Sequence, residues 1–397
     1  MLGILRIALD DKALAKAFGW PQGKRLLAAA VRGNNPVSPT TSAGVCPKSR
    51  LLCGTWIPRP HPSGDLADSR YNHPAMSTPM TRRQFLVTGA AAGLALSATA
   101  KLAAATSAPQ RKFYAILSLG RLGLHASFQE SVELATRYGF EGVDPDISYL
   151  ASLPDDTLHP LLDDLKKDLL KRNLKFGAAG LPVEFRKDAE TFNSDLKKLP
   201  ATSAVLERAG IGRVSTWIMP CSDDLTYLQN FRQHAERLRL CAQVLADHGQ
   251  KLGLEYVSPR TLWRSQKYPF IHTLSEMKEL LAAIGTDNLG IQLDSWHWFN
   301  AQETQQDLLT LRAQDVITVD LNDAPTGLTL DQYRDDSREL PAATGVIPVK
   351  QFLDALLQIG YDGPIQAEPF NAPLRALPLD QACAMTSDAM KKAFQLM

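Results

Sequence analysis

The sequence LGIQLDSWHW at residues 289–298 decides the fold of this chain. Its apolar run, 289–293, ends abruptly in Asp294, and His297 follows three residues later. Helix-like segments precede and follow the run, a pattern typical of a buried parallel strand that ends in a polar cluster. In a repeated strand–helix architecture, polar groups just past the carboxyl end of a strand line the active-site mouth. We therefore expect Asp294 and His297 to lie at such a mouth.

Three other runs in the C-terminal half end in the same way. They are KLGLEY at 251–256, VITVDLND at 316–323 and PIQAEPF at 364–370. Each predicts a strand that carries a carboxylate at or near its end, namely Glu255, Asp320 and Glu368. Because these strands are neighbours in a barrel, the sequence predicts that the three side chains share one rim with Asp294.

Strand and helix patterns alternate from about residue 110 to the end of the chain. The predicted strands are 113–119, 142–146, 175–181, 213–219, 251–257, 289–293, 316–321 and 364–368. The predicted helices are 127–138, 158–173, 195–209, 228–248, 274–284, 303–313, 349–359 and 379–395. This order predicts an α/β fold, a (β/α)8 TIM barrel. A doubly wound open sheet is the alternative, but no G-x-G-x-x-G or Walker sequence opens a helix here.

Composition excludes several classes of function. The formal net charge is +1 and no basic stripe is present, so nucleic acid is not an expected partner. No apolar run reaches the length of about 20 residues that a permanent membrane span needs. The cysteines show no CxxC spacing, and free, buried thiols are expected. They are Cys46, Cys53, Cys221, Cys241 and Cys383.

The N-terminal part of the chain differs from the rest. Residues 1–75 mix Pro, Ser, Gly and Arg without periodicity, which predicts a disordered or non-native leader. Residues 76–109 have the order of a twin-arginine signal peptide: TRRQFLV at 81–87, a small apolar run, and two A-x-A sites. We therefore expect the twin-arginine export machinery as a partner and a periplasmic or exported location. The barrel follows at 110–397.

Four carboxylates on one rim predict a bound cation. An isolated buried carboxylate costs several kcal/mol, so the cluster implies cations, shared protons or a metal. Oxygen ligands favour Mg²⁺ or Mn²⁺ over Zn²⁺. For any one of the four residues alone, a salt-bridged strand end or a helix N-cap is the competing interpretation.

From about residue 110 onward the chain resembles the xylose-isomerase-like superfamily of sugar (phosphate) isomerases and epimerases. The resemblance lies in Glu255 of LEY, in DSWH at 294–297 and in Glu368 of QAEP. DLND at 320–323, followed by RELP at 338–341 and Gly345, matches the family pattern after the seventh strand. Asp320 departs from that pattern, because it stands where the family has a metal-binding histidine.

The resemblance implies proton transfer at a carbon next to a carbonyl, through an enediolate. It assigns the acid/base roles to Glu255 and Glu368 and the metal to Glu255, Asp294, Asp320 and Glu368. His297 and Arg338 are expected to hold substrate oxygens. Trp296 and Trp298 are expected to form an apolar wall against a sugar face, whereas Trp217 is expected in the core.

Several functions remain open at this point. Export favours a sugar or keto-sugar without phosphate as the small-molecule substrate of an isomerase or epimerase. A lyase or dehydratase acting on a keto-sugar or glycoside begins with the same deprotonation, so the sequence does not separate it from an isomerase. A non-catalytic periplasmic sugar-binding barrel is the alternative that Asp320 supports. A homo-oligomer is compatible with the sequence.

Overall fold

The structure is a computed structural model that describes residues 110–151 and 155–397. The leader predicted at 1–75 and the twin-arginine signal predicted at 76–109 lie outside the described residues. Within the described residues, no helix combines the length and the apolar character needed to cross a membrane.

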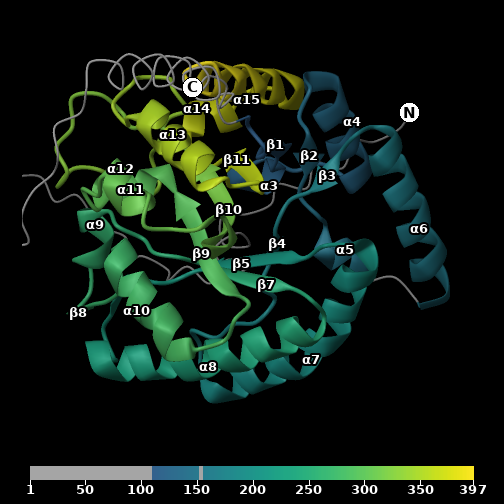
Figure 1. Cartoon of the computed structure of the whole chain (residues 1–397). Helices are drawn as coiled ribbons and strands as arrows, with labels where there is room; N and C mark the ends of the chain where they lie inside the picture. The colour runs from purple at the N-terminus through teal and green to yellow at the C-terminus, as the bar shows by residue number, and fades with distance from the viewer. Residues whose placement is uncertain (1–109, 152–154) are drawn as a thin grey trace, which may run out of the picture. The chain divides into compact units, whose positions relative to one another are not determined.

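A curled sheet of parallel strands forms the centre of the fold (Figure 1). Its hydrogen-bonded order is β3-β2-β1-β11-β10-β9-β7-β5-β4. The strands are β1 (Tyr114–Leu117), β2 (Gly142–Val143), β3 (Lys175–Phe176), β4 (Ala179–Gly180), β5 (Arg213–Trp217), β7 (Lys251–Glu255), β9 (Leu289–Asp294), β10 (Val316–Leu321) and β11 (Pro364–Ala367). A separate antiparallel pair joins β6 (Cys221–Ser222) to β8 (Tyr268–Pro269).

The third strand of the predicted barrel is interrupted. Its first half, β3, pairs with β2, and its second half, β4, pairs with β5. Because only Gly177 and Ala178 separate the halves, together they fill one strand position between β2 and β5. The sheet thus has eight strand positions in the order that the sequence predicts, and the (β/α)8 TIM barrel is confirmed.

Helices follow the strands and pack around the sheet (Figure 1). The longer ones are α4 (Phe128–Tyr138), α6 (Asp155–Lys171), α7 (Ala189–Ala209), α8 (Tyr227–Asp247), α10 (Leu274–Ile284), α13 (Val349–Ile359) and α15 (Leu379–Phe394). Four of them end at glycines in the left-handed conformation, where a side chain would be strained. These are Gly139, Gly210, Gly285 and Gly360. Such stop signals make most helix ends predictable from the sequence.

The helix predicted at 303–313 is wrong. A short helix, α11 (Ser295–Asn300), follows β9 directly, with the Asp294 carboxylate as its N-cap. Only 305–308 of the predicted segment is helical, as α12 (Gln305–Leu308), and a 3-10 turn (Ala313–Asp315) follows it. A capping box at Thr304 starts α12, and the Asp315 carboxylate accepts the backbone N–H of Arg312 at 2.8 Å and so starts the 3-10 turn. Each of these bonds begins a new turn, which explains the break.

The barrel interior is closely packed. Ile317 of β10 occupies the space opposite Gly253 and Gly290, where added Cβ atoms would approach its side chain to 2.9 Å and 2.7 Å. Glycine is thus required at both places by close packing. The cysteines of the described residues, Cys221, Cys241 and Cys383, are free and buried, as predicted.

Candidate metal and acid–base site

The structure brings the four predicted carboxylates together at the carboxyl ends of neighbouring strands. Glu255 and Asp294 are the last residues of β7 and β9, Asp320 lies near the end of β10, and Glu368 follows β11. All four are buried. Glu255, Asp320 and Glu368 each offer an oxygen within 4.8 Å of the others, which is close enough to share one ion.

Two arginines lie among these carboxylates. Arg338 is buried, and its Nη1 donates to Asp294 at 2.7 Å and to Glu368 at 2.9 Å, while its Nη2 donates to Asp335 at 2.9 Å. Arg121 of the short helix α3 (Leu119–Leu122) lies 2.6 Å from Glu368 and 3.1 Å from Asp320. Asp294, Asp320 and Glu368 therefore share two arginines, whereas among the described residues neither arginine pairs with Glu255.

Asp323 orients the loop that carries Arg338. Its carboxylate accepts four backbone hydrogen bonds of 2.7–2.9 Å. The donors are Ala324, Thr344, Gly345 and Ile347. Asp323 also forms an isolated bridge with Glu339, the residue after Arg338. The stretches 320–323, 338–341 and 345, which the sequence pattern links, thus form one folded loop.

Amide side chains complete the network. Gln292 donates to Glu255 at 3.0 Å and to Asp320 at 2.8 Å, and Gln366 donates to Asp320 at 2.8 Å. Asn322 donates to Asp294 at 2.9 Å. Sequence reasoning missed these amides, although two of them lie two residues before a site carboxylate on the same strand. Since alternate residues of a strand face the same side, that spacing could have revealed them.

Three of the buried site carboxyl groups, Glu255, Asp294 and Asp320, have raised pKa values. Burial, followed by the like charges of Glu368, Asp320 and Asp294, holds the pKa of Glu255 well above its ordinary value. Burial likewise raises the pKa of Asp294 to about 6, although Arg338 opposes the shift, and raises that of Asp320. Glu255 is also the member of the cluster with a buried oxygen, Oε1, that has no hydrogen-bond partner. An acceptor of this kind is suited to binding a cation or sharing a proton.

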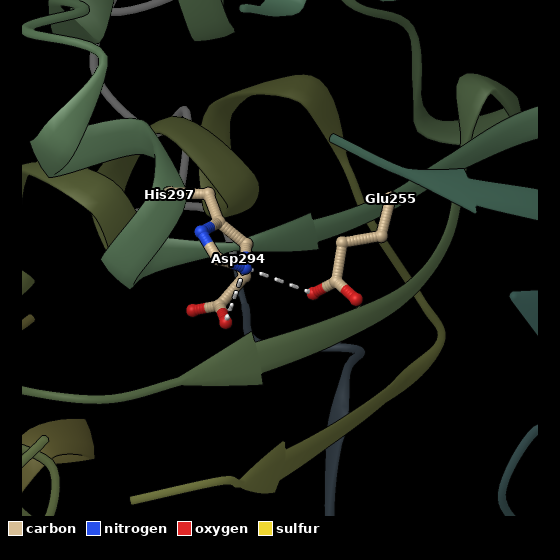
Figure 2. A group of neighbouring side chains, drawn as sticks. All are labelled: Glu255, Asp294 and His297. Atoms are coloured by element: carbon tan, nitrogen blue, oxygen red, sulfur yellow. Dashed lines mark ion pairs between the residues drawn. The ribbon is translucent and has the colours of Figure 1, made fainter. Parts of the chain in front are cut away.

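His297 faces the same cluster from α11, as Figure 2 shows. Its Nε2 lies 3.7 Å from both Glu255 and Asp294, and its Nδ1 accepts the backbone N–H of Ser258 at 3.3 Å. Burial and then Arg338 lower the pKa of His297, so the ring is neutral at pH 7. A neutral ring that accepts at Nδ1 carries its proton on Nε2. His297 is therefore arranged to donate a hydrogen bond into the cluster.

The tryptophans are placed differently from expectation. Trp296 and Trp298 are buried, with exposed fractions of 0% and 2%, and Trp298 packs against Phe352 of α13. Neither ring presents a free face to a sugar in this structure. Trp217, expected in the core, is instead 38% exposed at the carboxyl end of β5, and that expectation was wrong. Its neighbours on the strand are buried, so local hydrophobicity alone gave no sign of its position.

The raised carboxyl pKa values predict how stability depends on pH. Burial raises the pKa of Asp144 and Asp294 from 3.8 to about 6 and that of Glu303 from 4.5 to about 7. The folded state then binds more protons than the unfolded state over this range. The contribution of these groups to the free energy of unfolding is therefore largest at low pH and is lost as pH rises. In chelator, the unfolding temperature should fall by about 5 °C or more between about pH 5.5 and about pH 8.

Excess Mn²⁺ should reduce that fall, because a bound cation favours the ionised carboxylates. Differential scanning calorimetry at both pH values, with chelator and with Mn²⁺, measures the effect. An unfolding temperature that rises with pH in chelator would contradict the assignment.

A family model connects this geometry to known proteins. The model described as a xylose isomerase-like TIM barrel matches residues 132–392. The chain belongs to this family. The match includes the four site carboxylates and both His297 and Arg338.

Similar proteins within this group include more than one kind of enzyme. The chain is 20% identical over 269 residues to an inosose isomerase of Halalkalibacterium halodurans, which covers 66% of this chain and 90% of that protein. It is 28% identical over 146 residues to a 3-dehydroshikimate dehydratase of Pseudomonas aeruginosa, covering 36% of this chain and 22% of that protein. The structure of a xylose isomerase domain protein from Alicyclobacillus acidocaldarius superposes with a TM-score of 0.62 at 28% identity, covering 72% of this chain and 99% of that one.

Proposed function

We propose that this protein is a divalent-metal-dependent sugar isomerase or epimerase that moves a proton next to a carbonyl through an enediolate. Its family membership supports an enzyme of this chemistry. The observation that carries the proposal is Glu255, a buried glutamate of raised pKa with one unpartnered oxygen inside a carboxylate cluster. A non-phosphorylated sugar or keto-sugar is the proposed substrate.

The donor set fits a divalent ion. Glu255, Asp294, Asp320 and Glu368 would hold it, and the close grouping of Glu255, Asp320 and Glu368 supports an oxygen-only set. The alternative grouping of Glu255, Asp294 and His297 is less suitable, because the His297 Nε2 carries the ring proton. Oxygen ligands favour Mn²⁺ or Mg²⁺. When bound, such an ion polarises a carbonyl oxygen and so acidifies the neighbouring carbon.

The paired glutamates provide the proton transfers. Glu255 Oε2 is held by Gln292, which leaves Oε1 directed at a reacting carbon or oxygen. Glu368 is held from both sides by Arg121 and Arg338, so its position is fixed. We infer that one glutamate removes the proton and the other returns it, with the Nε2–H of His297 bonded to a substrate oxygen. Arg338 orients Glu368 and contacts substrate oxygens only after exchanging one of its carboxylate partners.

The location belongs to the proposal as well. The twin-arginine motif at 81–87 supports export to the periplasm by the twin-arginine machinery. This route favours a substrate that is available outside the cytoplasm, and free sugars fit that requirement.

Hydrogen exchange tests the proposed reaction. Purified protein with Mn²⁺ is incubated with free ketoses in D₂O, and the sugars are analysed by NMR. We expect deuterium at one carbon next to the carbonyl of a turned-over sugar, because the enediolate exchanges its proton with solvent. Absence of exchange in every ketose, with metal bound by elemental analysis, would contradict proton transfer and favour a binding protein.

A dehydratase is the second candidate, and the similarity to a 3-dehydroshikimate dehydratase supports it. Both reactions begin by removing a proton next to a carbonyl. In a dehydratase the electron pair then expels a hydroxyl group as water. Loss of water in the product mass, in place of exchange at constant mass, would identify this reaction.

A further inference from the structure

A third arginine, Arg186, contacts the carboxyl end of β5, the strand next to the one that carries Glu255. Arg186 is in the loop between β4 and α7, and such loops lie at the carboxyl ends of barrel strands. Trp217 is the last residue of β5 and pairs in register with Glu255, the last residue of β7. Since register partners of parallel strands face the same side, Trp217 is directed toward the mouth. Trp217 thus lies next to Glu255 on the neighbouring strand, and Arg186 contacts the Trp217 ring.

The two side chains form a fixed unit. The Arg186 guanidinium carbon lies 4.5 Å from the ring centroid of Trp217 and 4.5 Å from that of Phe185. Its Nη1 donates to the Trp217 carbonyl at 2.5 Å and to Thr216 Oγ1 at 3.4 Å. Phe185 is fully buried, whereas Trp217 is 38% exposed. The buried ring therefore anchors the guanidinium, and the exposed ring leaves a face open.

Arg186 has no ion-pair partner among the described residues. Among the described residues no carboxylate pairs with it, whereas Arg121 and Arg338 on the same rim each pair with at least two. Its Nε and Nη2 also have no hydrogen-bond partner among those residues. Burial lowers the pKa of Arg186, and only the more distant Glu184 opposes that shift. The Nε and Nη2 groups of this partly exposed cation are therefore available to bind the carboxylate of a ligand.

We propose that Arg186 and Trp217 form a subsite for the carboxylate of an acidic sugar, whose C–H face packs on the Trp217 ring. One guanidinium presents two parallel N–H groups that match a carboxylate in charge and shape. A phosphate dianion would keep a net negative charge at this single cation. Trp217 and Glu255 lie on adjacent strands, which are about 5 Å apart. This distance matches the few bonds that separate the carboxylate of a sugar acid from its reacting carbons. This inference rests on the proposed function, because it places the reacting carbons at Glu255.

Binding measurements test the subsite directly. Isothermal titration calorimetry on the full-length protein compares D-glucuronate, D-glucose and glucose 6-phosphate as probes. We expect glucuronate to bind more tightly than glucose, and Arg186→Gln to weaken glucuronate by about 10–100-fold while leaving glucose unchanged. Arg186→Lys keeps the charge without the paired N–H groups and should give an intermediate loss. Trp217→Ala should weaken both sugars.

Two controls separate charge from loop structure. Arg232→Gln removes the same charge from the exposed face of α8 and should change no affinity. Arg237 donates from α8 to the carbonyls of Phe185 and Lys187, so Arg237→Gln disturbs the same loop without removing the rim cation. If Arg237→Gln reproduces the selective loss of glucuronate, or if Arg186→Gln leaves the preference intact, the subsite is overturned. Preferential binding of glucose 6-phosphate would replace the carboxylate by a phosphate and likewise overturn it.

The outcomes separate this inference from the proposed function. Deuterium incorporation into neutral ketoses, without a preference for glucuronate, would support the isomerase and contradict the acidic subsite. Selective, Arg186-dependent binding of glucuronate without exchange in any sugar would support the subsite and contradict the isomerase.

Discussion

Glu255→Gln is expected to lower deuterium incorporation by about 10²–10⁴-fold. The amide keeps the size of the side chain and can still accept the Gln292 hydrogen bond at 3.0 Å, but it cannot exchange a proton with the substrate. The substitution also removes a buried carboxyl group whose pKa is raised by burial and by the like charges of its neighbours. The metal-free variant should therefore be at least as stable as the parent at about pH 8, and the loss of activity would not reflect unfolding.

Glu303→Gln is the matched control. Glu303 is another largely buried glutamate of raised pKa, but its oxygens accept from the Tyr256 hydroxyl at 2.6 Å and the Leu274 amide at 2.6 Å, away from the cluster. We expect this variant to keep its exchange activity and to change stability only. NMR of the exchanged sugar measures the activity of both proteins, and thermal unfolding measures their stability. Equal loss of deuterium exchange in the two variants would contradict the catalytic role of Glu255.

Arg338→Met is expected to cost about 3–5 kcal/mol of the free energy of unfolding in the metal-free protein. Arg338 pairs with Asp294, Asp335 and Glu368 at 2.7–2.9 Å, and its side chain is 1% exposed. Methionine fills a similar volume but leaves these carboxylates without their common cation. Breaking a buried ion pair at one partner is costly because the remaining charge stays out of water.

Chemical unfolding in urea with chelator gives this free energy, and added Mn²⁺ should recover part of it by returning positive charge. Arg264→Met is the matched control, since Arg264 is exposed and pairs with the exposed Asp331 at 3.1 Å. That substitution should cost about 1 kcal/mol or less. Similar losses in the two variants would show that the buried pairs contribute little.

Much of the fold could be predicted because it depends on local signals. Glycines 139, 210, 285 and 360 end helices as expected, and the strands at 251–255, 289–294 and 316–321 lie where apolar runs indicate them. The interruption at 177–178 was not predictable, because it depends on which neighbour each half of the strand pairs with. The start of α12 within the segment 303–313 could have been found, since the capping box of Thr304 and Asp307 is visible in the sequence.

The candidate site was predictable where chemistry follows strand ends. The four carboxylates and His297 meet as expected, although their roles stay predictions. Arg121 was missed because nothing near it in sequence marks it, and it meets Glu368 only when β1 lies beside β11. Arg186 was missed for a similar reason, since its neighbour Trp217 comes from another strand. Contacts between distant segments depend on tertiary structure, which local patterns do not encode.

The pairing of Arg121 with Glu368 has a consequence for how the protein matures. Arg121 follows the first strand of the barrel and Glu368 follows the last, so the two residues are 247 positions apart in the chain. A ribosome-bound or truncated chain that lacks the last strand therefore cannot assemble the cluster. Under the proposed function, a newly made chain would therefore acquire its divalent ion only after synthesis of the whole barrel.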